Sequence, residues 1–225
     1  MKKLIGILTL ALSLLLACSK AAPHDAATPS PDPHGGENAA AEDQVYTAIV
    51  TVKQSATGRI FFQLDDDYRL FPENYTEPFT RQCRIICGIS VREGTNVCSL
   101  DWMDYLQEGT VQSTPAEIGD GVDILDDWMT SVEDGYLTLH YSTYWGQVSP
   151  HTLLLVSGEN PDDPYEVRLV HLRNGDEART QADALIYFDL ASLPPTGGNG
   201  HTFTLNWKDG AGHQLSKQFL YRSRQ

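Results

Sequence analysis

The sequence predicts an all-β protein with two domains, a small OB-like barrel followed by an antiparallel β-sandwich. Short runs rich in β-branched and aromatic residues recur from Val45 to Tyr221. Several of these runs alternate apolar and polar residues, and turns rich in Gly, Asn and Asp separate them. No stretch has the 3.6-residue apolar periodicity of a long helix.

The chain begins with a pattern typical of a lipoprotein signal peptide. Two lysines precede an apolar run, Leu4–Leu16, which is too short for a membrane span of about 20 residues. The run ends in Leu15-Leu16-Ala17-Cys18, which resembles the bacterial lipoprotein box. We therefore expect residues 1–17 to be removed, and we expect the acylated Cys18 to be the protein's contact with the membrane.

The next segment, residues 18–43, is predicted to be a flexible tether. It is rich in Ala, Pro, Gly and short polar residues and has no apolar face. Ser19 stands where inner-membrane lipoproteins typically have Asp, so we expect an outer-membrane lipoprotein. The acidic run that often follows the cysteine of surface-exposed lipoproteins is missing, and the periplasmic and surface faces both stay open as locations.

The chain is strongly acidic. It has 16 Lys and Arg against 30 Asp and Glu, a formal net charge of −14 that becomes −16 without the two lysines of the signal peptide. Such a charge repels nucleic acids and anionic lipid headgroups, so we expect no nucleic-acid partner. A cationic partner would instead be attracted.

Residues 44–110 are predicted to form the OB-like barrel. Five short strands with tight turns between them favour a small closed or half-closed barrel over an open sheet. The predicted strands are Val45–Lys53, Arg59–Leu64, Tyr68–Phe71, Gln82–Val91 and Cys98–Trp102.

The remaining residues are predicted to form a linker and the sandwich. Residues 111–134 are polar and rich in Gly and Asp, with one helical turn expected at Ile124–Met129. Residues 135–225 contain six further strands without intervening helices, which is typical of a β-sandwich. These strands are Tyr136–Thr143, Thr152–Ser157, Tyr165–Leu172, Ala184–Asp189, Thr202–Trp207 and Gln214–Tyr221.

Three cysteines, Cys83, Cys87 and Cys98, lie in the predicted barrel. The first two are four residues apart on one strand, about 13 Å, which is too far for a disulfide. A two-residue turn at Glu93-Gly94 would place Cys98 opposite Ile89, about 7–8 Å from Cys87. Two interpretations stay open: a Cys87–Cys98 disulfide, made possible by one bulge, or buried free thiols.

The sequence contains no catalytic or metal-binding motif that we recognise. Gly-x-Ser-x-Gly and His-Glu-x-x-His are missing, and the Cys-x₃-Cys spacing lacks a second pair of ligands. The histidines after residue 135 are scattered among strand ends. We therefore predict a non-enzymatic protein with no catalytic residues, no metal site and no cofactor.

Tyr144 and Trp145, at the end of a predicted strand, are the candidates for contact with a ligand or partner. Trp145 shares a strand face with Leu139 and Tyr141 and is expected to complete the core, whereas Tyr144 points the other way. An exposed aromatic ring at a strand end can stack on a sugar or anchor a protein or peptide.

Several segments are similar to NigD-like lipoproteins of Bacteroidota. They are Tyr136–Tyr141, Tyr144–Gly146, Asn160–Val167 and Tyr187–Pro194 and, more loosely, Ile60–Asp66 and Arg84–Val91. The resemblance implies an OB-like domain followed by a β-sandwich, a proposed role in bacteriocin immunity and no defined catalytic residues. We expect either a lipid-anchored protein with a binding or protective role, or a glycan-binding module of the outer membrane.

Overall fold

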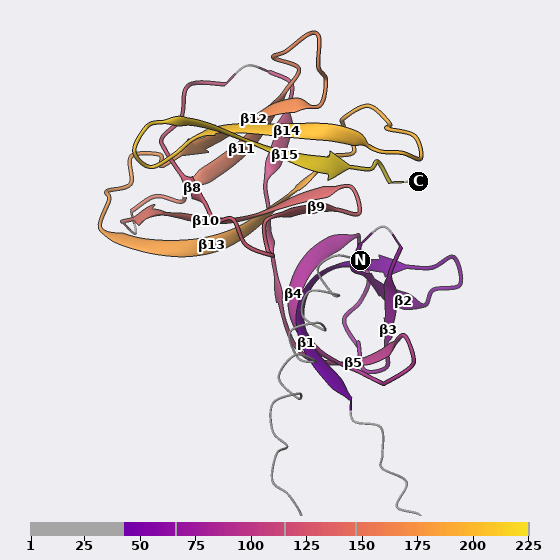
Figure 1. Ribbon diagram of the computed structural model, residues 1–225. Helices are drawn as coiled ribbons and strands as arrows, with labels where there is room; N and C mark the ends of the chain where they lie inside the picture. The colour runs from indigo at the N-terminus through magenta and orange to yellow at the C-terminus, as the bar shows by residue number, and fades with distance from the viewer. Residues whose placement is uncertain (1–42, 66, 115, 147, 225) are drawn as a thin grey trace, which may run out of the picture. The chain divides into compact units, whose positions relative to one another are not determined.

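The computed structural model describes residues 43–225 apart from Asp66, Pro115, Gln147 and Gln225. Asp43–Gln225 is one compact unit, and all of its regular elements are β-strands (Figure 1). The predicted signal peptide, Cys18 and all but the last residue of the predicted tether lie outside the described residues. Within the described part, no helix is long and apolar enough to cross a membrane.

The first five strands close into a barrel (Figure 1). Their order around the barrel is β1-β2-β3-β5-β4, and β4 pairs again with β1. β3 and β5 are parallel, whereas the other neighbours are antiparallel. This arrangement confirms the predicted OB-like barrel. The strands are β1 (Gln44–Gln54), β2 (Ile60–Gln63), β3 (Arg69–Pro72), β4 (Cys83–Val91) and β5 (Val97–Tyr105).

The alternating residues of β4 fill the barrel, as their pattern predicts. Ile85, Cys87 and Ile89 are at most 1% exposed and pack against Val50 and Phe62 of the neighbouring strands. Successive side chains of a strand point to opposite faces, so the residues between them face out of the barrel.

A separate apolar cluster joins the barrel to the sandwich. Ile49 and Ile86, on the outer face of the barrel, pack with Leu106, Tyr136 and Tyr187. The rings of the two tyrosines meet edge to face, with their centroids 5.6 Å apart. The barrel and the sandwich therefore share buried apolar surface.

The sandwich consists of two packed sheets (Figure 1). One sheet has the order β6-β13-β10-β8, with β9 also paired to β10, and the other has the order β15-β14-β12-β11-β7. The strands are β6 (Gln107–Glu108), β7 (Thr110–Gln112), β8 (Asp123–Ile124), β9 (Ser131–Glu133), β10 (Tyr136–Trp145), β11 (Thr152–Ser157), β12 (Glu166–Leu172), β13 (Thr180–Asp189), β14 (His201–Lys208) and β15 (Gln214–Tyr221).

The structure differs from expectation in residues 111–134, which contribute strands to the sandwich instead of forming only a linker. β7 pairs with β11, and β8 and β9 pair with β10. Ile124, expected in a helical turn, belongs to β8 and lies opposite Tyr141 of β10. Each of these strands is only two or three residues long with one apolar residue, which is too short for an alternating pattern. β9 pairs with β10 across the two-residue turn Asp134-Gly135, whereas β7 and β8 pair with strands farther along the chain.

The sheets are also mixed, although an antiparallel sandwich was expected. β6 with β13, β7 with β11 and β12 with β14 are parallel pairs. β13 lies in the opposite sheet from β12 and β14, so the chain leaves one sheet and returns to it in the same direction.

Candidate binding site

A depression of about 370 Å³ lies where the end of β5 meets β10 and β13. It combines apolar side chains with carboxylates, and concave sites of this composition use a few polar groups to orient a ligand. The lining residues are Ile86, Asp104, Tyr105, Leu106, His140, Asp183, Ala184 and Leu185. We refer to this set of residues as the acidic depression.

His140 in the acidic depression is held between two carboxylates. Its Nδ1 lies 2.6 Å from Oδ2 of Asp127, and its Nε2 lies 3.8 Å from Oδ2 of Asp183. The strand positions it there, because alternate residues of β10 enter the core and His140 falls on the opposite face. The side chain is 15% exposed and lines the acidic depression.

The carboxylate beside His140 is stabilised as an anion. Burial alone would raise the pKa of Asp127, but hydrogen bonds from His140 and from the backbone N–H groups of Met129 and Thr130 lower it below its ordinary value. The side-chain carboxylate of Asp104 has no hydrogen bond or ion pair with any described residue. The acidic depression therefore carries negative charge that the described part of the chain does not neutralise.

A second depression, of about 570 Å³, is lined by Glu108 and Asp189 among others. Its carboxylates are already paired, since Arg81 Nη1 lies 2.5 Å from Glu108 and Arg224 bonds to Asp189. This difference makes the acidic depression the better candidate for a cationic ligand.

The acidic depression lacks the arrangement of a nucleophilic active site. His140 and Asp127 resemble two members of a catalytic triad, but the free ring nitrogen faces Asp183 and not a hydroxyl or thiol. Among the described residues, no group of three or more His, Cys, Asp and Glu could hold a metal ion. The carboxylates of the acidic depression can accept hydrogen bonds and can bind a positively charged group.

The structure separates the two aromatic residues singled out in the sequence. Tyr144 is 50% exposed and lies on the same face of β10 as His140, four residues further along the strand. Trp145 packs against the sandwich core, and its Nε1 donates to the carbonyl of Ala182 at 3.1 Å. Of the two, Tyr144 is the exposed ring, and neither residue lines the acidic depression.

Trp145 covers a buried polar network that the sequence did not suggest. Its ring stacks on His151 at a centroid distance of 4.2 Å. His151 Nε2 lies 3.2 Å from Asp176 Oδ2, and His151 Nδ1 lies 3.0 Å from Nε2 of His171. His171 Nδ1 in turn lies 3.0 Å from the carbonyl oxygen of Gly121.

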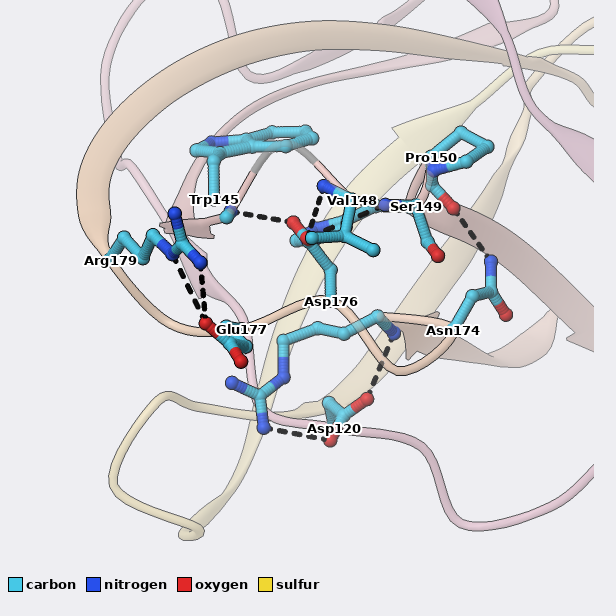
Figure 2. A network of polar contacts seen from close by, with 12 residues as sticks. Asp120, Trp145, Val148, Ser149, Pro150, Asn174, Asp176, Glu177 and Arg179 are labelled. Atoms are coloured by element: carbon cyan, nitrogen blue, oxygen red, sulfur yellow. Dashed lines mark hydrogen bonds and ion pairs between the residues drawn. The ribbon is translucent and has the colours of Figure 1, made fainter.

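Asp176 ties the loop after β10 to the turn before β13 (Figure 2). Its carboxylate accepts backbone N–H groups from Val148 at 2.8 Å, Gly146 at 2.6 Å and Ser149 at 3.4 Å. Led by the bond from Val148, these hydrogen bonds outweigh burial and hold the pKa of Asp176 far below its ordinary value. The network is missed in the sequence because each of its hydrogen bonds joins residues that are 20 or more positions apart.

The three cysteines of the barrel are free thiols, so the structure does not contain the Cys87–Cys98 disulfide. The turn between β4 and β5 is longer than the two residues expected. The hydrogen bond from Arg92 N–H to the carbonyl of Val97 closes it. Cys98 consequently lies opposite Val91, and Cys87 lies opposite Met103. Burial raises the pKa of Cys87 to about 12 and that of Cys98 to about 11.

The fold defines an all-β protein in which a closed OB-type barrel precedes a mixed β-sandwich. Residues 108–221 match the family described as the NigD-like C-terminal beta sandwich domain. The match spans half of the chain, so the protein belongs to the NigD-like family. No curated protein sequence matches it.

Solved structures from Bacteroidales share the fold. A protein of Parabacteroides distasonis, described as toxin-related, has a TM-score of 0.67 and 22% identity over 80% of this chain and 94% of its own. A NigD-like immunity protein of Bacteroides caccae has a TM-score of 0.56 and 17% identity, covering 79% and 98%. A protein of Bacteroides fragilis, described as a lipoprotein, has a TM-score of 0.54 and 13% identity, covering 81% and 100%. At these identities the likeness shows the fold alone.

Proposed function

We propose that this protein is a lipid-anchored, non-enzymatic envelope protein whose acidic depression binds a cationic peptide or protein, with a protective role like that of a bacteriocin-immunity protein. The observation that carries the proposal is the charge of the acidic depression. Asp104 and Asp183 line it without a Lys or Arg partner among the described residues, whereas the carboxylates of the second depression are neutralised.

Two further properties support a cationic partner. The whole chain has a formal net charge of −14, which steers a cationic molecule toward it and accelerates association at low salt. Tyr105, which is 58% exposed, and the apolar residues beside it offer the surface that an amphipathic peptide needs.

The membrane location rests on the sequence and on the descriptions of similar proteins. The lipoprotein box ends at Cys18, and Ser19 after it favours the outer membrane. The B. fragilis protein is described as a lipoprotein, and the B. caccae protein as an immunity protein. We extend both descriptions to this chain as part of the proposal.

The experiment titrates the intact chain with a synthetic Lys-rich amphipathic peptide at low and at physiological ionic strength. We expect salt-sensitive binding that the double variant Asp104→Asn/Asp183→Asn weakens by about tenfold or more. Glu93→Gln/Asp162→Asn is the matched control, because it removes the same charge from two exposed turns. Equal weakening by the two double variants, or no binding at low ionic strength, contradicts the proposal.

A glycan-binding role is the second candidate, and the 50% exposed ring of Tyr144 favours it. Under this alternative, Tyr144→Ala abolishes oligosaccharide binding without changing stability, and the Asp104→Asn/Asp183→Asn variant leaves it intact. The two series of variants therefore distinguish the candidates.

A further inference from the structure

We propose that the sandwich contains a buried proton-linked latch, in which His151 is an imidazolium at neutral pH and joins the loop after β10 to Asp176 and His171. This proposal is independent of the acidic depression and goes beyond the binding function. It follows from counting the hydrogens that the three buried side chains need in order to bond as they do.

The partners of His171 determine which of its ring nitrogens carries a proton. Its Nδ1 lies 3.0 Å from the carbonyl oxygen of Gly121, which can only accept a hydrogen bond, so Nδ1 carries a proton. Burial lowers the pKa of His171, which keeps the ring neutral. Its Nε2 therefore has no proton and presents a lone pair to His151.

His151 must then carry both ring protons. Its Nδ1 lies 3.0 Å from the lone pair of His171 Nε2 and has to donate. Its Nε2 lies 3.2 Å from the carboxylate of Asp176 and has to donate as well. Asp176 is ionised, because the backbone N–H groups that donate to it lower its pKa. A ring that donates from both nitrogens is an imidazolium.

The surroundings of His151 suit a buried cation. The side chains of His151 and Asp176 are each 1% exposed, so the two charges neutralise each other away from water. Trp145 stacks on the ring at an interplanar angle of 14°, which adds a cation–π contact. The other charges that face the pair, Asp120 and Arg173, are bonded to each other.

Losing the proton would disrupt the network. A neutral His151 has one ring proton for two acceptors, so either the contact with His171 or the contact with Asp176 becomes a repulsion between lone pairs. Asp176 also holds the N–H groups of Gly146 and Val148, so this change reaches the loop beneath Trp145 (Figure 2). Protonation of one buried ring thereby controls how firmly this loop is fixed.

The latch predicts a definite dependence of stability on pH. An imidazole in the unfolded chain releases its proton near pH 6.5, whereas the folded chain retains it. Above this pH the folded state binds one proton more, so the folded-to-unfolded ratio falls by about tenfold for each pH unit until the folded state also loses the proton.

Nitrogen-15 NMR of the histidine rings in the intact chain tests the charge directly. At pH 7.5 we expect His151 to show the imidazolium pattern and His171 to show the neutral pattern protonated at Nδ1. The amide signals of Gly146 and Val148 should shift with the same midpoint as His151 when the pH is raised. A neutral His151 at pH 7.5, or amides that do not follow it, would overturn the proposal.

A second measurement compares unfolding at pH 6 to 9 in the wild type, His151→Gln and the control His213→Gln. His213 is also bonded to an aspartate, with Nδ1 3.0 Å from Asp209, but its side chain is 74% exposed. In the wild type and in His213→Gln we expect stability to fall as the pH rises above 6.5. In His151→Gln we expect this fall to be smaller. The same slope in all three chains would refute the latch, and if His151→Gln does not fold, the NMR result on the wild type decides.

Discussion

Lys53 of the barrel and Asp134 of the sandwich form an ion pair of 2.5 Å in which the two side chains are only 16% and 7% exposed. The adjacent Glu133 lies 3.5 Å from Nη2 of Arg84, a barrel residue whose side chain is fully buried. One turn of the sandwich, between β9 and β10, therefore contacts two cations of the barrel. These charges reinforce the apolar cluster at the same junction.

Replacing Lys53 with Met should destabilise the protein, because it leaves Asp134 largely buried without this cation. Removing one partner of a buried pair costs about 3–5 kcal/mol, and partial exposure of this pair reduces the expected loss to about 2–4 kcal/mol. Urea unfolding of both chains measures the difference. Lys217→Met is the control, since Lys217 pairs with the exposed Asp126 and should cost less than about 1 kcal/mol. Equal losses in the two variants would contradict the structural role of the junction pair.

Gly88→Ala should displace the indole of Trp102, which covers the glycine from the neighbouring strand. A Cβ at residue 88 would lie 2.2 Å from Nε1 of Trp102, and the ring, 46% exposed, can move into solvent. We expect a loss of about 1 kcal/mol and a red shift of the tryptophan fluorescence. Gly198→Ala is the control, because no atom lies within 4 Å of the added carbon. An unchanged spectrum in Gly88→Ala would show that Trp102 does not rest on Gly88.

The buried cysteines should resist alkylation in the native protein. At pH 8 a thiol with a pKa of about 12, as at Cys87, is about one part in 10⁴ thiolate, and burial also restricts access. Cys98, with a pKa of about 11, should behave similarly, and the half-buried Cys83 should react first. Mass spectrometry after iodoacetamide treatment, with and without urea, measures this order. A Cys87–Cys98 disulfide detected before reduction would contradict the free thiols of the structure.

Asp176→Asn should lower stability at neutral pH and remove part of the acid dependence of unfolding. The pKa of Asp176 is lowered in the folded state, whereas an aspartate in the unfolded chain titrates near 3.9. Its contribution is therefore present above about pH 4 and is lost as the pH falls through the folded pKa. Unfolding midpoints of wild type and variant should converge as the pH is lowered below about 4. Asp162→Asn, at an exposed turn, should run parallel to the wild type at every pH, and divergence at low pH would count against this role of Asp176.

Much of the fold could be predicted because its pattern is local. The alternation in Gln82–Val91 places Ile85, Cys87 and Ile89 in the barrel, and the corresponding pattern places Leu139 and Tyr141 in the sandwich core. Register could not be predicted to the residue, since a turn two residues longer moves Cys98 from Ile89 to Val91. The strands β7 and β8 are too short to alternate and pair with strands farther along the chain. β9 forms a hairpin with β10 across Asp134-Gly135, a local turn signal that was missed in the sequence.

The acidic depression was not predicted, for the same reason, and the candidates Tyr144 and Trp145 do not line it. Tyr144 was recognised as an outward-facing residue, but nothing local connects it with Asp104 of the barrel or with Asp127 beside His140. His151 and His171 seemed scattered in the sequence, yet adjacent strands bring their ring nitrogens to 3.0 Å. The position of a polar side chain relative to another strand depends on register and turn length.

The sequence alone determined the all-β class, the order of barrel and sandwich, the strongly negative charge and many of the core residues, because these follow from composition and from the alternation of apolar residues along each strand. Only the tertiary structure decided the free state of the cysteines, the acidic depression and the buried network of His151, His171 and Asp176. Each of these depends on a few ångströms between residues far apart in sequence, and strand pairing sets those distances only when the whole sheet has formed.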